Sequence, residues 1–182
     1  YRSPQPGIWR VNTTRLHGLD GTQVQDLTRA EIEGRRQVAL LMRFFHEYLP
    51  GFKRAILLDT AAQIGVRETR RIVGEYLLTV EDLIQGTDFP DVIALGSYPV
   101  DIHSPTGLGG GVLASLQMGY QTAPIYQIPY RCLIPNVVDQ LLVAGRCLSA
   151  THEAAAAVRV QPTAYASGHA AGVAAALSVQ RE

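Results

Sequence analysis

The sequence has little of the residue patterns that mark specialised classes of protein. Its 182 residues include only two cysteines, Cys132 and Cys147, which stand in neither a CxxC nor a His-flanked pattern. We expect both thiols to be reduced and buried, with a disulfide or a redox role as the alternative, and we expect no metal site. No apolar run reaches the roughly 20 residues that span a bilayer, so no membrane partner is expected.

An excess of charge of one sign is also missing. Lys plus Arg and Asp plus Glu each total 16, so no net field favours nucleic acid as a partner. The apolar fraction of 47% is ordinary for a globular protein. The sequence begins at Tyr1 without a methionine or a charged-then-apolar leader. We therefore expect a processed or partial chain whose targeting signal is not visible, with a cytoplasmic location by default.

A third pattern that the chain lacks is GxGxxG after an opening strand, the usual phosphate-binding turn of a dinucleotide site. Glycines do gather in SPTGLGGG at 104–111, where they predict a flexible loop. We do not expect a Rossmann turn there, because the segment that follows is predicted to be a strand and not a helix.

Capping patterns predict two helices in the first half of the chain. Thr28 and Glu31 form a capping box that predicts the start of a long helix, which Pro50-Gly51 ends. This helix carries an apolar stripe made of Ile32, Val38, Leu41, Phe45 and Leu49. Thr79 and Asp82 predict a second, short helix by the same logic.

Short apolar or alternating runs predict strands before, between and after these helices. The predicted strands are 7–16, 55–58, 92–95, 98–102 and 126–133, the last with a bend at Pro129. This mixture predicts an α+β (α/β) fold in two parts. Residues 1–135 are expected to form a mixed-sheet substrate or cap domain, and residues 136–182 a returning piece of a nucleotide-binding domain.

The carboxyl-terminal part predicts half of a nucleotide site. Residues 140–148 are mainly apolar, and they predict a strand at 141–144 that ends on a glycine turn at Gly145-Arg146. Residues 159–176 predict a helix that opens on Pro162 and is crowded with alanine and glycine. Such a unit lets backbone approach a phosphate-bearing ligand closely. The alternative is a plain helix that packs by its small residues against a sheet.

Arginines gather in GVRETRR, where Arg67, Arg70 and Arg71 repel one another unless anions or carboxylates balance them. The carboxylates available for structural pairing are Glu68, Glu75, Asp59 and Asp101. The functional alternative is forked recognition of an anionic substrate or a cofactor phosphate. Arg67 is the functional candidate among the three, because it directly follows a predicted strand end at Ile64-Gly65.

Three further polar pairs are candidates for substrate contacts. Asp101 and His103 are two residues apart at the end of a predicted strand, which places a carboxylate and an imidazole on one face as an acid/base pair. Tyr130-Arg131 either orients a substrate or is an edge-of-core aromatic beside a cation. At His152-Glu153, the histidine is either a hydrogen-bonded loop residue or a proton donor to a substrate.

Three segments of the chain carry a family resemblance. They are, in order, IGVRETRRIVGEYLLTVEDL (64–83), IPYRCLIP (128–135) and LLVAGRCLSATHEAAAAVRVQPTAYASGHAAGVAAA (141–176). Together they resemble the carboxyl-terminal portion of an FAD-dependent oxidoreductase family, distantly similar to the fumarate reductase and glutathione reductase type flavoproteins. The resemblance implies that residues 136–182 belong to a Rossmann-like FAD-binding domain whose amino-terminal half is absent from this chain.

The resemblance also implies positions around the flavin. In such flavoproteins the final helix points its amino terminus, with about half a positive charge, at the pyrimidine edge of the ring. Ring contacts are therefore expected from Gln161, Pro162 and Thr163. Gly145 and Arg146 are expected beside the ribityl chain and diphosphate, where Arg146 forms a charge-assisted bond to a phosphate.

The activity implied is hydride or electron transfer through FAD on an unidentified small-molecule substrate. The candidate catalytic residues are Arg159, His103 and Arg67, since a fixed cation near the ring stabilises negative charge or holds a substrate carboxylate. For Arg159 the alternative is a solvated arginine at a helix end. We expect this chain by itself not to retain FAD. The rival hypothesis is a non-catalytic α/β binding or assembly domain, and the sequence does not indicate an oligomeric state.

Overall fold

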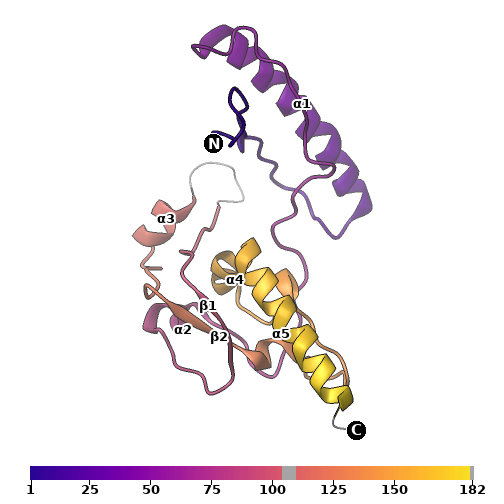
Figure 1. Ribbon diagram of the computed structural model, residues 1–182, viewed down its shortest axis with the longest axis vertical. Helices are drawn as coiled ribbons and strands as arrows, with labels where there is room; N and C mark the ends of the chain where they lie inside the picture. Colours follow the sequence, from indigo (N-terminus) through magenta and orange to yellow (C-terminus); the bar gives the residue numbers. More distant parts are fainter. Residues whose placement is uncertain (104–109, 181–182) are drawn as a thin grey trace. The chain divides into compact units, whose positions relative to one another are not determined.

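The computed structural model describes residues 1–103 and 110–180, and residues 104–109 of the loop predicted at 104–111 lie outside them. The chain divides into two compact units, Tyr1–Gly65 and Val66–Glu182. Figure 1 shows the first unit built around one long helix, α1 (Val24–Tyr48), and the second around a small sheet and several shorter elements.

In the first unit, α1 ends where the sequence predicts but begins four residues earlier than expected. Thr28 lies inside the helix, where its hydroxyl donates to the Val24 carbonyl at 3.0 Å. Glu31 accepts a hydrogen bond from the Ile64 backbone N–H at 2.7 Å instead of capping the helix. The predicted capping box was therefore wrong, because an Asp20 turn leads into the helix and Thr22 N–H binds the Asp20 carboxylate at 2.8 Å.

The first unit buries little apolar surface. Ala30 is the one buried residue of α1, and Ile32 of the predicted apolar stripe is exposed. The strands predicted at 7–16 and 55–58 are wrong, because no neighbouring strand is present among the described residues of this unit to complete a ladder. One isolated bridge joins Arg2 to Trp9, and Ile56 is exposed.

The second unit holds the sheet and most of the helices. Its elements in chain order are α2 (Val80–Gln85), β1 (Val92–Gly96), α3 (Val112–Gln117), β2 (Tyr126–Pro129), η1 (Tyr130–Leu133), η2 (Gly145–Cys147), α4 (His152–Val158) and α5 (Gln161–Gln180). β1 and β2 pair antiparallel, with Gly96 opposite Tyr126. The capping box predicted for α2 is confirmed, because the Thr79 hydroxyl accepts from Asp82 N–H and the Asp82 carboxylate accepts from Thr79 N–H.

The core of this unit is made of buried apolar residues from α2, the sheet, η1 and α4. All five residues from Ala154 to Val158 are buried, so α4 runs through the interior and contacts α2. Alanine side chains permit this close approach of helix backbone to its neighbours. Tyr126 is also buried and packs against Gly96, where an added Cβ would lie 2.2 Å from a tyrosine ring carbon. Cys132 is buried as expected, whereas Cys147 is exposed, and both thiols are free.

Several predicted strands of the second unit were wrong. Residues 98–102 form no strand, and the strand predicted at 126–133 ends at Pro129, after which η1 begins. Asp91 accounts for this change, because its carbonyl and carboxylate accept the backbone N–H groups of Tyr130 and Arg131 at 2.8 and 3.0 Å. The segment after the glycine run forms the helix α3 instead of a strand, so the reason given against a Rossmann turn there fails.

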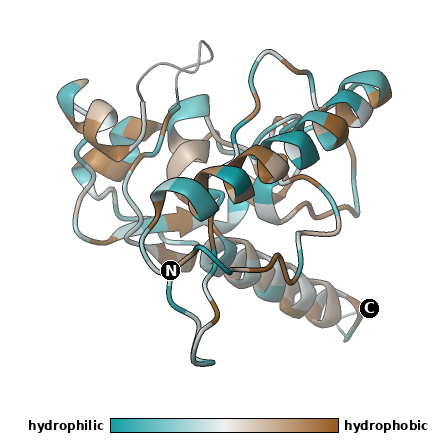
Figure 2. Ribbon diagram, turned by 90° about the horizontal axis from the view of Figure 1, so that it is seen from above, coloured by the Kyte–Doolittle hydropathy of each residue, from teal (hydrophilic) through white to brown (hydrophobic). Residues whose placement is uncertain are grey.

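The carboxyl-terminal prediction was right about the helix and wrong about the strand. Residues 141–144 form no strand, because no described strand lies beside them. The Val143 N–H donates to the Leu133 carbonyl at 2.8 Å. α5 begins at Gln161 with Pro162 in its first turn, as predicted, and extends to Gln180. Figure 2 shows α5, which leads to the labelled C-terminus, as weakly hydrophobic along much of its length.

The mixture of helices with a small antiparallel sheet is the predicted α+β class. The Rossmann-like character of residues 136–182 stays a prediction. The domain boundary at residue 135 also stays a prediction. The residues on both sides of it lie in the second compact unit.

Candidate active site

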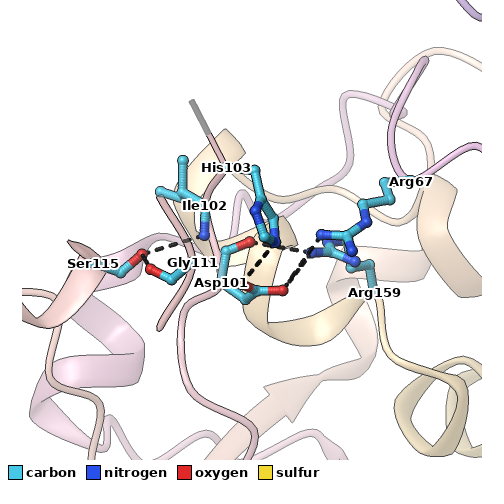
Figure 3. A network of polar contacts seen from close by, with 7 residues as sticks. All are labelled: Arg67, Asp101, Ile102, His103, Gly111, Ser115 and Arg159. Atoms are coloured by element: carbon cyan, nitrogen blue, oxygen red, sulfur yellow. Dashed lines mark hydrogen bonds and ion pairs between the residues drawn. The ribbon is translucent and has the colours of Figure 1, made fainter. Parts of the chain in front are cut away.

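Asp101 lies at the centre of a polar cluster in the second unit (Figure 3). Arg159 Nη2 lies 3.2 Å from Asp101 Oδ2 and 3.1 Å from the Asp101 carbonyl oxygen. Arg67 Nη1 lies 3.4 Å from the same Oδ2, and His103 Nε2 lies 3.1 Å from Oδ1. The three residues predicted to be catalytic are thus brought together on one carboxylate. Their roles stay predictions.

Each member of this cluster has its own structural support. Arg159 is the C-cap of the buried helix α4, and its backbone N–H donates to the Ala155 carbonyl at 3.0 Å. A cation at this end of a helix is favoured by the partial negative charge of the last carbonyls. Asp101 and His103 lie on the irregular segment after β1, and Arg67 lies near the start of the second unit.

The electrostatics of the cluster centre on Arg159, whose side chain is 15% exposed, against 12% for Asp101 and 50% for Arg67. Burial lowers the pKa of the Arg159 guanidinium, repulsion from Arg67 lowers that pKa further, and attraction by Asp101 opposes both. An arginine remains charged in spite of such a shift. Two guanidinium charges against one carboxylate leave the cluster with an excess of one positive charge.

Arg159 has donors left for a further partner. Both of its hydrogen bonds to described residues use Nη2, whereas a guanidinium carries five N–H donors in all. The arrangement can therefore hold an added anionic group beside Asp101. Since a carboxylate only accepts hydrogen bonds, Asp101 also assigns the His103 proton to Nε2.

Ser115 completes the network in Figure 3, and the sequence analysis did not single it out. Its hydroxyl accepts a hydrogen bond from Ile102 N–H at 3.2 Å and donates one to the Gly111 carbonyl at 3.1 Å. Ile102 lies between the two acid/base candidates in the chain. A serine in a short helix after a glycine run carries no distinguishing pattern, so only the fold identifies this contact.

The predicted cofactor residues Gly145 and Arg146 share a small hollow with Arg159. The hollow has about 150 Å³ of empty volume and is too narrow to admit a water molecule. Gly145 has φ +76°, which favours glycine, and its N–H donates to the buried Ser167 hydroxyl of α5 at 2.9 Å. The side chain of Arg146 is directed to the Val66 carbonyl oxygen, at 2.9 Å.

The remaining predicted cofactor residues form the first turn of α5. Gln161 and Pro162 are exposed, and Thr163 is buried. The Ala164 N–H binds the Val160 carbonyl at 3.0 Å. The earlier N–H groups of a helix have no partner within it, so the exposed end of α5 presents donors and partial positive charge.

Other charged residues of the second unit form structural pairs. Glu68 binds both Arg71 and His152, the latter at 2.9 Å between Oε2 and Nδ1. Arg131 makes a two-pronged contact with Asp91, at 3.0 and 3.2 Å. Hydrogen bonding from Arg131 lowers the pKa of the Asp91 carboxyl in spite of partial burial. For Arg71 the structure supports the pairing alternative.

The described residues also bear on metal sites and membrane spans. No group of three or more His, Cys, Asp or Glu side chains is arranged there to hold a metal ion. Among the helices of the described ranges, none combines the length and the apolar character needed to cross a membrane.

The chain matches the model of a known protein family. The family model described as FAD dependent oxidoreductase matches residues 2–182, almost the whole chain. This match confirms the resemblance seen in the sequence. Neither the curated proteins nor the solved structures compared with the chain include a match.

Proposed function

The chain belongs to the FAD-dependent oxidoreductase family, and from this premise we propose that its second unit forms the flavin-ring side of an active site for a small anionic substrate. The observation that carries this proposal is the gathering of Arg159, Arg67 and His103 on Asp101. Arg159 also lies two residues before the start of α5. When bound, FAD supplies the hydride or electron transfer itself.

The first turn of α5 supports a role in holding the flavin ring. α5 is 20 residues long, and Gln161 and Pro162 at its start are exposed. In our proposal Gln161 and Thr163 offer backbone N–H donors to the ring, and Pro162, which has no N–H to leave unpaired, lies between them in the first turn of the helix. The positive end of the helix would stabilise negative charge on the bound group.

Gly145 and Arg146 are proposed to lie along the ribityl and diphosphate part of the cofactor. An added Cβ at Gly145 would meet no atom within 4 Å, so backbone there is open to close approach. Arg146 is an exposed side chain whose single bond to a described residue is to a backbone carbonyl. Exchange of that neutral acceptor for a phosphate would strengthen the hydrogen bond.

The Asp101 cluster supports the choice of an anionic substrate. Arg67 is half exposed and lies at a long 3.4 Å from Asp101, so it is the cation most able to turn to an added carboxylate. Arg159 would hold the same group through donors other than Nη2. His103, whose proton Asp101 fixes on Nε2, is the proposed proton carrier, and Asp101 is the residue that orients it.

The direct test is flavin content and anion binding in the natural polypeptide that carries this chain. We expect one FAD per polypeptide after gel filtration, read from its visible absorbance bands. Acetate should then perturb those bands in a saturable way, whereas acetamide, a neutral molecule of similar shape, should not. A polypeptide that purifies without FAD and takes none up when incubated with it would contradict the flavin site, and an equal response to acetamide would contradict anion recognition.

A further inference from the structure

We propose that Ser115 is a positioning residue for the Asp101 and His103 side chains, an inference that rests on the function proposed above. Ser115 is 1% exposed and makes two hydrogen bonds through one hydroxyl. It accepts from Ile102 N–H at 3.2 Å and donates to the Gly111 carbonyl at 3.1 Å. Neither Asp101 nor His103 is touched directly, so Ser115 acts through the backbone between them.

Two hydrogen bonds hold the backbone of Ile102, one to its carbonyl oxygen and one from its N–H. Its carbonyl oxygen accepts a hydrogen bond from Gly111 N–H at 2.6 Å, and its N–H donates to Ser115. Ser115 N–H in turn donates to the Gly111 carbonyl at 3.0 Å. Residues 102, 111 and 115 therefore form one closed set of hydrogen bonds, which fixes the direction in which the flanking side chains leave the chain.

Gly111 brings this set into contact with the cluster itself. Its φ of +87° favours glycine, and an ideal Cβ added there would lie 3.7 Å from Asp101 Oδ1 and 3.8 Å from His103 Cε1. Gly111 thus lies close to both side chains of the carboxylate–imidazole pair. A shift of Gly111 or Ile102 would change that pair geometry directly.

A purely helical role does not account for the Ser115 hydroxyl. Serine in a helix commonly donates to the carbonyl four residues earlier, and the bond to Gly111 is of this type. The second bond, accepted from Ile102, adds nothing to the helix. It connects α3 by a hydrogen bond to the segment that carries Asp101 and His103. Misplacement of a catalytic group by about 1 Å can cost a hundredfold in rate, so such a tie is functionally significant.

The test compares Ser115→Ala with Ser115→Thr, which keeps a hydroxyl, and with Ser178→Ala as a control. The Ser178 hydroxyl also donates to a backbone carbonyl of its own helix, at 2.8 Å, but it accepts no hydrogen bond from another described residue. The readout is the hydrogen-bonded Nε2–H signal of His103 in the nitrogen-15 NMR spectrum of the 182-residue chain, identified by its loss in His103→Gln. This readout needs no flavin.

We expect the His103 Nε2–H signal to be lost or strongly shifted in Ser115→Ala, retained in Ser115→Thr and unchanged in Ser178→Ala. An unchanged signal in a folded Ser115→Ala variant would overturn the positioning role. If Ser115→Ala does not fold, Ser115→Cys, which keeps the side-chain volume but accepts hydrogen bonds poorly, replaces it with the same two outcomes.

The acetate titration of the FAD-loaded natural polypeptide separates this inference from the proposed function. With Ser115→Ala we expect acetate affinity to fall about tenfold while FAD content stays at one per polypeptide. A wild-type protein that shows the His103 signal but no acetate response would contradict the proposed function alone. A Ser115→Ala protein with wild-type acetate affinity and an unchanged His103 signal would contradict the positioning role alone.

Discussion

A single nitrogen of Arg159, Nη2, binds both the carboxylate and the backbone carbonyl of Asp101, at 3.2 and 3.1 Å. The contact joins the end of α4 to the segment after β1, which are 58 residues apart in the chain. Because Ala154–Val158 of α4 are buried, the helix fixes the position of Arg159, and Arg159 in turn fixes Asp101. The cluster is therefore part of the structure of the second unit before any ligand binds.

Asp101→Asn should destabilise the chain, because it removes the charge that balances Arg159 and Arg67. Asparagine keeps an acceptor and the backbone contact survives, so we expect a loss of about 1–3 kcal/mol in the free energy of unfolding. The measurement is denaturant unfolding of the 182-residue chain. Glu33→Gln is the control, since its pair with Arg36 is exposed at 3.7 Å and should contribute under about 1 kcal/mol. Equal effects of the two substitutions would contradict this account.

Gly96→Ala should be among the most damaging single changes in the second unit. Its added methyl would lie 2.2 Å from the Tyr126 ring, and Tyr126 is itself buried and donates to the Tyr98 carbonyl. We expect a loss of about 1–3 kcal/mol or more from overpacking. Gly168→Ala in α5 meets no atom within 4 Å and should stabilise the helix by about 0.5–1 kcal/mol. Thermal unfolding of both variants measures the two opposite shifts.

The two cysteines should differ in reactivity. Burial raises the pKa of the Cys132 thiol to about 12, so at neutral pH it is protonated and shielded from solvent. Cys147 is exposed. We expect iodoacetamide to modify Cys147 in the native chain and Cys132 only after unfolding, with the sites read by peptide mass spectrometry. Modification of both at the same rate in the folded chain would show that Cys132 is not buried.

Asp91 should make the stability of the second unit sensitive to acid. Hydrogen bonding from Arg131 lowers the pKa of Asp91 below its ordinary value of 3.8, so the folded state binds its proton less readily than the unfolded state. The stabilisation is then complete above the unfolded pKa and is lost as pH falls through the lower, folded pKa. Asp91→Asn should flatten the fall in unfolding free energy below about pH 4. An unaltered pH profile would show that the pair contributes nothing.

The sequence predicted two helix starts that depend on neighbouring residues. The capping box of Thr79 and Asp82 and the start of α5 near Pro162 depend on neighbouring residues only, and both were predicted. The strands predicted at 55–58 and 141–144 were wrong because an apolar run forms a strand only beside a partner. A single sequence does not show whether that partner exists.

For the candidate site, too, the sequence predicted some of the residues but not the contacts between them. The sequence identified Arg67, His103 and Arg159 as candidates. That they gather around Asp101 depends on contacts between residues far apart in the chain, since Asp101 is 34 residues from Arg67 and 58 from Arg159. Ser115 was not predicted at all. Its part in the network depends on the conformation of residues 102 and 111, which no pattern in the sequence specifies.

The most direct test of the central claim is acetate binding to the FAD-loaded natural polypeptide in the wild-type, Arg159→Ala and Arg36→Ala forms. Arg36 is an exposed arginine of α1 and serves as the matched control. Loss of a charged hydrogen bond of about 1.5–3 kcal/mol predicts an affinity about tenfold to a hundredfold weaker in Arg159→Ala. Arg36→Ala should bind acetate as the wild type does. Wild-type affinity in Arg159→Ala, with the flavin still bound, would contradict the placement of Arg159 in the active site.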